Sequence, residues 1–157
     1  MGKRRATIVQ TGDPMLFRVE LEIPVSSKTI FDFIAIPSNH SVMDGSKMVK
    51  GTLSGPDRLF LGAKFGMKMK QGIPYLIKNE VVEFEEGRSI AWRHLLHNVW
   101  RYELQPINEG KALVVESWDG RNARAQWWLR FRSFDKWVPI AMAKTLVQLE
   151  EVLLKKS

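Results

Sequence analysis

The feature that most constrains the fold is a long central region with no helical pattern. Between residues 46 and 119, turn residues divide the chain into about six runs of strand length. The dividers are Gly55-Pro56-Asp57, Gly72, Glu86-Gly87, His97-Asn98 and Asn108-Glu109-Gly110. Connections this short join antiparallel neighbours, because a parallel crossover needs a dozen or more residues. We therefore expect a meander of antiparallel strands.

The segment before this region predicts one strand and two short helices. Residues 16–23 alternate apolar and charged side chains, which is the period of a half-buried strand. Ser26 or Ser27 can then cap a short amphipathic helix, and Pro37 can begin a second one that ends near Met43. The inner face of the strand would carry Phe17, Val19, Leu21 and Ile23.

After Gly120 the pattern becomes helical. Asp135 is a possible cap, and a helix with a continuous apolar stripe is expected to run to about Leu154. The stripe consists of Val138, Met142, Leu146, Leu149 and Leu153. An antiparallel sheet with helices gathered on one face is an α+β architecture.

Composition favours one globular domain over residues 15–157, preceded by a flexible N-terminal arm, residues 1–14. The chain has 157 residues, of which 45% are hydrophobic and 26% charged. It has no cysteine, which excludes disulfides, thiolate metal sites and a cysteine nucleophile, and its three histidines leave little for a metal site. We expect no metal and no cofactor. The absence of an export signal or a long apolar run favours a cytoplasmic location.

Two sequence segments carry a family resemblance. Residues 36–45, Ile-Pro-Ser-Asn-His-Ser-Val-Met-Asp-Gly, are similar to a D-P-x-x-H-P-x-W-D-G segment, with matches at Pro37, His40, Asp44 and Gly45. The second match is residues 79–92, followed by 100–104. With the order of elements, these residues resemble the SRPBCC superfamily, also called START-like or helix-grip. The likeness is greatest to its polyketide cyclase/dehydrase branch.

The resemblance implies a seven-stranded antiparallel sheet curved around the long C-terminal helix, with an apolar cavity between them. Members bind lipids, sterols, polyketides or plant hormones, and some catalyse cyclisation or dehydration. Fold alone does not choose among these activities. In this chain Ile36, Ser41 and Met43 depart from the family segment, so the role of its Trp at the cavity entrance does not carry over.

The alternation of side chains along the strands predicts which residues form one wall of such a cavity. Trp92 and His94 share a face of one run, Trp100 and Tyr102 of the next, and Glu116 and Trp118 of the last. The same residues could instead form a packed core with satisfied hydrogen bonds. We expect His94, Glu116 and Tyr102 as candidate acid–base residues, and Trp92, Trp100 and Trp118 as ligand contacts.

Further ligand contacts are expected on one strand and on the C-terminal helix. Phe65, Met67 and Met69 alternate with lysines that would face solvent, and Phe131 and Met142 lie on the helical segments. His40 with Asp44 is expected to brace the loop after the second helix rather than to bind a metal, because two ligands do not make a site.

The net charge of +7, from 24 Lys and Arg against 17 Asp and Glu, is concentrated in three places. They are the arm, the run from Lys64 to Lys70, and residues 121–136. In residues 124–137 aromatic and basic residues interleave. This pattern favours a segment that closes the cavity mouth. Transient docking on a membrane surface is the second interpretation, and nucleic-acid binding is the least favoured.

The first functional hypothesis is a protein that binds a hydrophobic small molecule, lipid-like or polyketide-like, between sheet and helix. The alternative is a cofactor-independent polyketide cyclase or dehydratase. A third is a regulatory or partner-binding domain without a ligand. The pattern leaves the identity of the ligand and the oligomeric state open.

Overall fold

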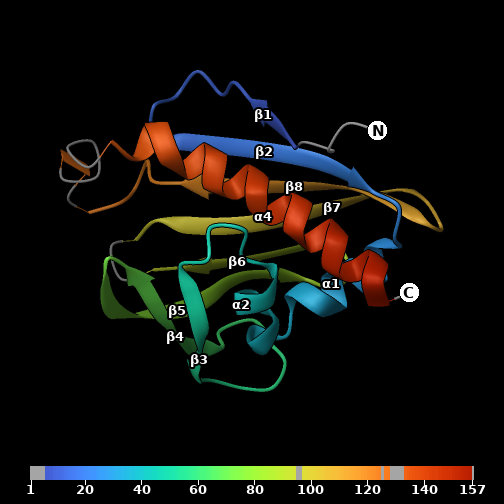
Figure 1. Ribbon diagram of the computed structural model, residues 1–157, viewed down its shortest axis with the longest axis horizontal. Coiled ribbons are helices and arrows are strands. Elements are labelled where there is room, and N and C mark those ends of the chain that lie inside the picture. Colours follow the sequence, from blue (N-terminus) through green and yellow to red (C-terminus); the bar gives the residue numbers. More distant parts are fainter. Residues whose placement is uncertain (1–5, 95–96, 125, 128–132, 157) are drawn as a thin grey trace.

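In the computed structural model, an eight-stranded antiparallel sheet packs against one long helix (Figure 1). The structure describes residues 6–94, 97–124, 126–127 and 133–156. The strand order is β1-β2-β8-β7-β6-β5-β4-β3. The strands are β1 Thr7–Val9, β2 Leu16–Ile23, β3 Val49–Ser54, β4 Lys64–Gln71, β5 Ile73–Glu85, β6 Ser89–Arg93, β7 Val99–Asn108 and β8 Lys111–Asp119. The helices are α1 Ser27–Ile34, η1 Pro37–Asn39, α2 His40–Met43 and α4 Phe134–Lys156.

The α+β class and the order of elements after β1 are confirmed, and the strand count needs one correction. Seven strands were expected, and β1 is an eighth, within the segment predicted as a flexible arm. Its residues Thr7, Ile8 and Val9 pair with Glu20, Val19 and Arg18 of β2. Three residues are too few to show a strand period, and this strand forms because the edge of β2 offers it hydrogen-bond partners.

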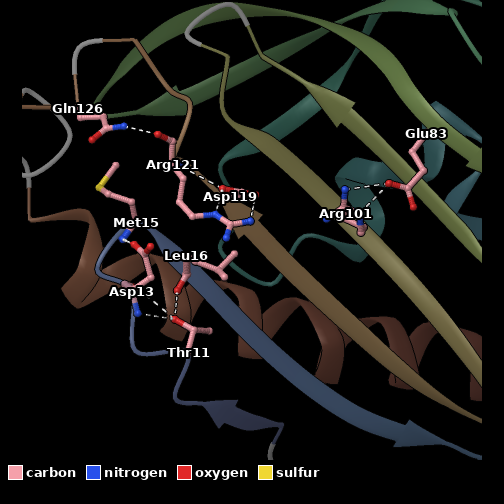
Figure 2. A network of polar contacts seen from close by, with 9 residues as sticks. All are labelled: Thr11, Asp13, Met15, Leu16, Glu83, Arg101, Asp119, Arg121 and Gln126. Carbon is pink, nitrogen blue, oxygen red and sulfur yellow. Dashed lines mark hydrogen bonds and ion pairs between the residues drawn. The ribbon is translucent and has the colours of Figure 1, made fainter.

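Side-chain hydrogen bonds hold the turn that leads into β2 (Figure 2). Thr11 Oγ1 donates to the carbonyl of Leu16 at 2.6 Å, and the backbone N–H of Met15 donates to Asp13 Oδ1 at 2.8 Å. Asp and Thr side chains commonly replace backbone partners in this way. The turn starts β2 in the register that buries Phe17.

The predicted alternation of β2 is observed, since Phe17, Val19, Leu21 and Ile23 are all buried. The capping prediction is also confirmed. Ser26 caps α1 by accepting a hydrogen bond from the backbone N–H of Thr29 at 3.3 Å. The second helix is a 3₁₀ turn at Pro37–Asn39 that continues into α2.

Helix α4 crosses one face of the sheet, with α1 and α2 on the same side (Figure 1). We call this the inner face. All five residues of the predicted stripe, Val138, Met142, Leu146, Leu149 and Leu153, are buried. Burial of each such side chain contributes roughly 1.5–3 kcal/mol, so α4 is anchored along most of its length. Among the described residues, no helix has the length and apolar character needed to cross a membrane.

Candidate ligand-binding site

A cavity of about 120 Å³ lies between the inner face of the sheet and α4. The sheet contributes Met69, Trp92, His94, Trp100, Tyr102 and Glu116. Helix α4 contributes Trp137, Ala141, Met142 and Thr145. The segment from α2 to the start of β3 contributes His40, Met43, Asp44, Ser46, Met48 and Val49. An apolar lining with a few convergent polar groups is typical of small-molecule sites.

Strand register brings the sheet residues of the cavity together. Trp92 of β6 pairs with Trp100 of β7, and Tyr102 of β7 pairs with Glu116 of β8. Residues two apart on a strand share a face, so these side chains stand on the same side of the sheet. The parity argument from the sequence is therefore correct for β6, β7 and β8.

An aromatic cluster, formed by His40, Phe65, Trp92 and Tyr102, makes one wall. The imidazole of His40 stacks on Trp92 with ring centroids 4.9 Å apart, and Phe65 meets both rings edge-on at 5.7 Å. Trp92 lies 5.7 Å from Tyr102. Such contacts add to the stability that area burial alone provides, so this wall is held in one arrangement.

The acidic group of the cavity is Glu116, which is only 1% exposed. Tyr102 Oη donates a hydrogen bond to Glu116 Oε1 at 2.9 Å. Burial raises the pKa of Glu116 well above its usual value, although the bond from Tyr102 opposes this. Burial, followed by the neighbouring Glu116 carboxylate, likewise raises the pKa of Tyr102. Burial therefore favours the protonated form of Glu116, which has an O–H group to donate.

Four buried polar atoms on the cavity lining have no hydrogen-bond partner among the described residues. They are Glu116 Oε2, Trp100 Nε1, His94 Nδ1 and His40 Nδ1. Buried polar atoms in proteins nearly always have a partner, and an exception needs a reason. The cavity thus combines apolar area with donors and acceptors that the protein itself leaves available.

Both histidines of the cavity are neutral. Burial lowers the pKa of His40 to about 4, and it lowers the pKa of His94 to about 4 as well. His40 Nε2 lies 2.8 Å from the carbonyl of Ile34. Because a carbonyl only accepts, Nε2 carries the proton and His40 Nδ1 is an acceptor.

Asp44 lines the cavity and holds the loop between α2 and β3. Its Oδ1 accepts from the backbone N–H of Ser46 at 2.9 Å, and Oδ2 accepts from the N–H of Val49 at 2.8 Å. The N–H of Gly45 donates to Thr145 Oγ1 of α4 at 3.1 Å. The predicted bracing role of Asp44 is therefore observed, and the loop is tied to the helix.

The structure brings together most of the residues nominated from sequence. His94, Tyr102, Glu116, Met69, Trp92, Trp100 and Met142 line the cavity. Glu116 bonds Tyr102, and no bond joins it to His94 among the described residues.

The remaining nominated residues lie elsewhere. Phe65 is buried edge-on to Trp92 and lines a second cavity, and Met67 is buried outside the lining of both cavities. Trp118 is 1% exposed and stacks on Phe17 with centroids 5.0 Å apart, so it belongs to the core. Phe131 lies outside the described residues.

The sequence reasoning missed the part of the lining that comes from the α2–β3 loop and from α4. Trp137, Ala141 and Thr145 follow one another at four-residue spacing, which places them on one row of the helix. That row lies beside the predicted apolar stripe, so its spacing could have predicted that these residues line the cavity. The loop residues Ser46 and Met48 had no periodic signal, because a loop has no period.

A sheet closed over a long C-terminal helix, with a cavity between them, defines the helix-grip or START-like fold, and this chain has that fold. No protein-family model matches the chain. An uncharacterized protein of Mycobacterium tuberculosis is 32% identical over 120 residues, which are 76% of this chain and 53% of that protein. The chain thus spans about half the length of the curated relatives it matches.

Solved structures agree on the fold. A Mycobacterium smegmatis protein superposes with a TM-score of 0.73 and 13% identity over 98% of this chain and 100% of its own. The Zhui aromatase/cyclase of a Streptomyces species superposes with a TM-score of 0.71 and 9% identity, covering 90% of this chain and 94% of its own. Identities this low show a common fold, and the fold is compatible with hydrophobic ligand binding.

Proposed function

We propose that this protein binds a small hydrophobic molecule in the cavity and that Glu116 donates a hydrogen bond to an acceptor oxygen of that molecule. The observation that carries the proposal is the buried Glu116, whose Oε1 accepts from Tyr102 while Oε2 has no partner among the described residues. Burial raises its pKa, which favours the protonated form. A protonated carboxyl in an apolar site is a strong donor to a carbonyl or phenolic oxygen. The aromatase/cyclase structure with the same fold supports a lipid-like or polyketide-like ligand.

The volume of the cavity restricts what it can enclose. At about 120 Å³ it is close to a cavity of about 150 Å³ that binds benzene, and well below the roughly 300–1,000 Å³ of drug-sized sites. The proposed ligand therefore places one ring, or a short acyl segment, in the interior. Any larger remainder extends beyond the cavity.

Two ring compounds of similar shape test the donor role. Acetophenone offers a carbonyl, and ethylbenzene does not. Titration followed by tryptophan fluorescence should show acetophenone binding about 2- to 10-fold more tightly, the value of one hydrogen bond. Glu116→Leu should abolish this preference, and Glu116→Gln, which keeps an N–H donor, should retain it. Equal affinity of the wild type for both compounds would contradict the proposal.

The second candidate is a cofactor-independent dehydratase, and its support is that His94 and Glu116 line the same cavity. Neutral His94 would take a proton from carbon next to a carbonyl, while Glu116 keeps its proton and donates a hydrogen bond to the developing enolate oxygen. The imidazolium would then protonate a β-hydroxyl that leaves as water, so that the protons balance. Because the pKa of His94 is about 4, it is a weak base near neutral pH, which ranks binding first.

A β-hydroxy ketone with one aromatic ring separates the two candidates. Its dehydration to the conjugated enone is followed by ultraviolet absorbance. If the protein is an enzyme, His94→Ala removes turnover and leaves binding of the ketone nearly intact. If it is a binding protein, the wild type shows binding and no turnover above the uncatalysed rate.

A further inference from the structure

A second cavity, which we call the edge cleft, opens where the β5–β6 ladder ends. Its volume is about 440 Å³. Glu80 of β5 pairs with Arg93, the last residue of β6, whereas β5 continues back to Ile73 with β4 as its neighbour. Among the described residues, β5 therefore has no partner on this side before Glu80, and residues from both faces of β5 reach the cleft.

The charged residues of the edge cleft are mostly basic. Lys64, Lys78 and Arg93 line it, together with the single carboxylate of Glu80. Glu80 Oε1 lies 4.0 Å from Arg93 Nη2 and partly compensates the positive charge of Arg93. Lys64 and Lys78 make no ion pair with any described residue. The cleft therefore has an excess of positive charge, with Glu80 as the register partner of Lys64.

At this end of the ladder the structure also leaves polar atoms without partners. Asn79 lines the cleft and is 3% exposed, yet neither its Nδ2 nor its Oδ1 has a hydrogen-bond partner among the described residues. Asn79 precedes Glu80 and His94 follows Arg93, so each is the next residue beyond the last pair of the ladder, and both line the cleft. His94 Nδ1 has no partner among the described residues either. Unsatisfied buried groups are costly unless something else satisfies them.

His94 connects the two cavities, because it lines both the edge cleft and the cavity under α4. We propose that the edge cleft holds an oxyanion, a carboxylate or a phosphate monoester, at the far end of the ligand whose ring occupies the cavity. Asn79 Nδ2, Lys64 and Lys78 supply the donors and the positive charge. The proposed ligand class is then a ring with an anionic tail, and this inference rests on the proposed function.

Matched probes test the proposal. They are ω-phenyl carboxylates of increasing chain length, the corresponding phosphate monoesters, and the uncharged alcohols of the same lengths. At low ionic strength, where exposed charges are little screened, we expect the anions of sufficient length to bind about tenfold more tightly than the alcohols. The ratio of carboxylate to phosphate affinity identifies which oxyanion the cleft prefers.

The control uses two other lysines of β4, which stand on the same face of that strand as Lys64. The double variant Lys64→Gln, Lys78→Gln should lose the preference for anions. Lys68→Gln, Lys70→Gln removes the same charge outside the cleft lining and should keep it. Equal loss in both double variants, or no preference in the wild type, would overturn the edge cleft as an anion site.

A separate measurement distinguishes failure of the edge-cleft proposal from failure of the proposed function. Inorganic phosphate, titrated without any ring compound, should shift the side-chain amide resonances of Asn79 in the wild type and not in the Lys64, Lys78 variant. If the alcohols bind and no anion preference appears, the cavity proposal stands and the cleft proposal fails. If phosphate shifts the Asn79 resonances but no ring compound binds, the proposal that one ligand occupies both cavities is disproved.

Discussion

Tyr102 and Glu116 are register partners on β7 and β8, and Tyr102 Oη donates to Glu116 Oε1 at 2.9 Å on the lining of the cavity. A tyrosine that donates to one carboxyl oxygen leaves the other available to carry a proton. Burial raises the pKa of Glu116, which favours an acid O–H over a charge facing whatever enters. Four predictions concern this pair and the residues that shape the cavity around it.

Glu116 should make the protein less stable as the pH rises. Its pKa lies above the usual 4.5 in the folded state, so the folded protein binds more protons than the unfolded chain above pH 4.5. Stability therefore falls as pH rises from 4.5 through the folded pKa. Glu116→Gln keeps an acceptor for Tyr102 and lacks this proton. Its melting temperature should exceed that of the wild type by a margin that widens from pH 5 to pH 9, and a constant margin would contradict the assignment.

His40 should make the protein sensitive to acid. Its folded pKa is about 4, and its ordinary value is 6.5. Between these values the unfolded chain binds the extra proton, so stability is complete above pH 6.5 and falls as pH decreases towards 4, by about 3 kcal/mol. Urea unfolding should show that the free energy of unfolding decreases less from pH 7 to pH 4.5 in His40→Gln than in the wild type. In His97→Gln, which changes a less buried histidine, this decrease should equal that of the wild type.

Gly45 should tolerate no side chain. A Cβ there would lie 2.3 Å from the backbone carbon of Lys144, and backbone of α4 cannot move aside without releasing the helix. Gly45→Ala should cost several kcal/mol, in the range of the largest single-site effects. Gly110→Ala is the matched control, because its nearest atom would be Asn108 Oδ1 at 3.8 Å. Thermal unfolding of the two variants compares them directly, and similar melting temperatures would show that the loop is not pressed against α4.

Trp100 and Trp118 should separate binding from stability. They are neighbours in register, but Trp118 is buried against Phe17, whereas Trp100 lines the cavity. Trp118→Leu should cost about 2–4 kcal/mol and leave the acetophenone affinity nearly unchanged. Trp100→Leu should reduce that affinity more than it reduces stability. Denaturant unfolding and the fluorescence titration, with Trp92 as reporter, measure the two effects.

The elements of the fold could be predicted because their signals are local. The alternation of residues 16–23 and the stripe from Val138 to Leu153 each depend on a period that short segments show by themselves. The helix cap at Ser26 is also local. Strand β1 was missed because Thr7–Val9 has no period of its own and forms only against the edge of β2.

The candidate site could be predicted only in part. Parity placed Trp92, Tyr102 and Glu116 on one face, and that is where they lie. Parity could not show that Trp100 lines the cavity while Trp118 belongs to the core, because both side chains stand on the same face of the sheet. What separates them is Phe17, which stacks on Trp118 from a strand about a hundred residues away in the chain.

The sequence by itself determined the α+β class, the order of strands and helices after β1, and the face on which Tyr102 and Glu116 stand. Each of these follows from the backbone periods of strand and helix, which are properties of neighbouring residues. The tertiary structure alone decided the size of the cavity, the contact of the Asp44–Gly45 loop with Thr145, and the presence of Asn79 and His94 on the lining of one cleft. Those depend on how far apart side chains from distant segments come to rest, and no local period encodes that distance.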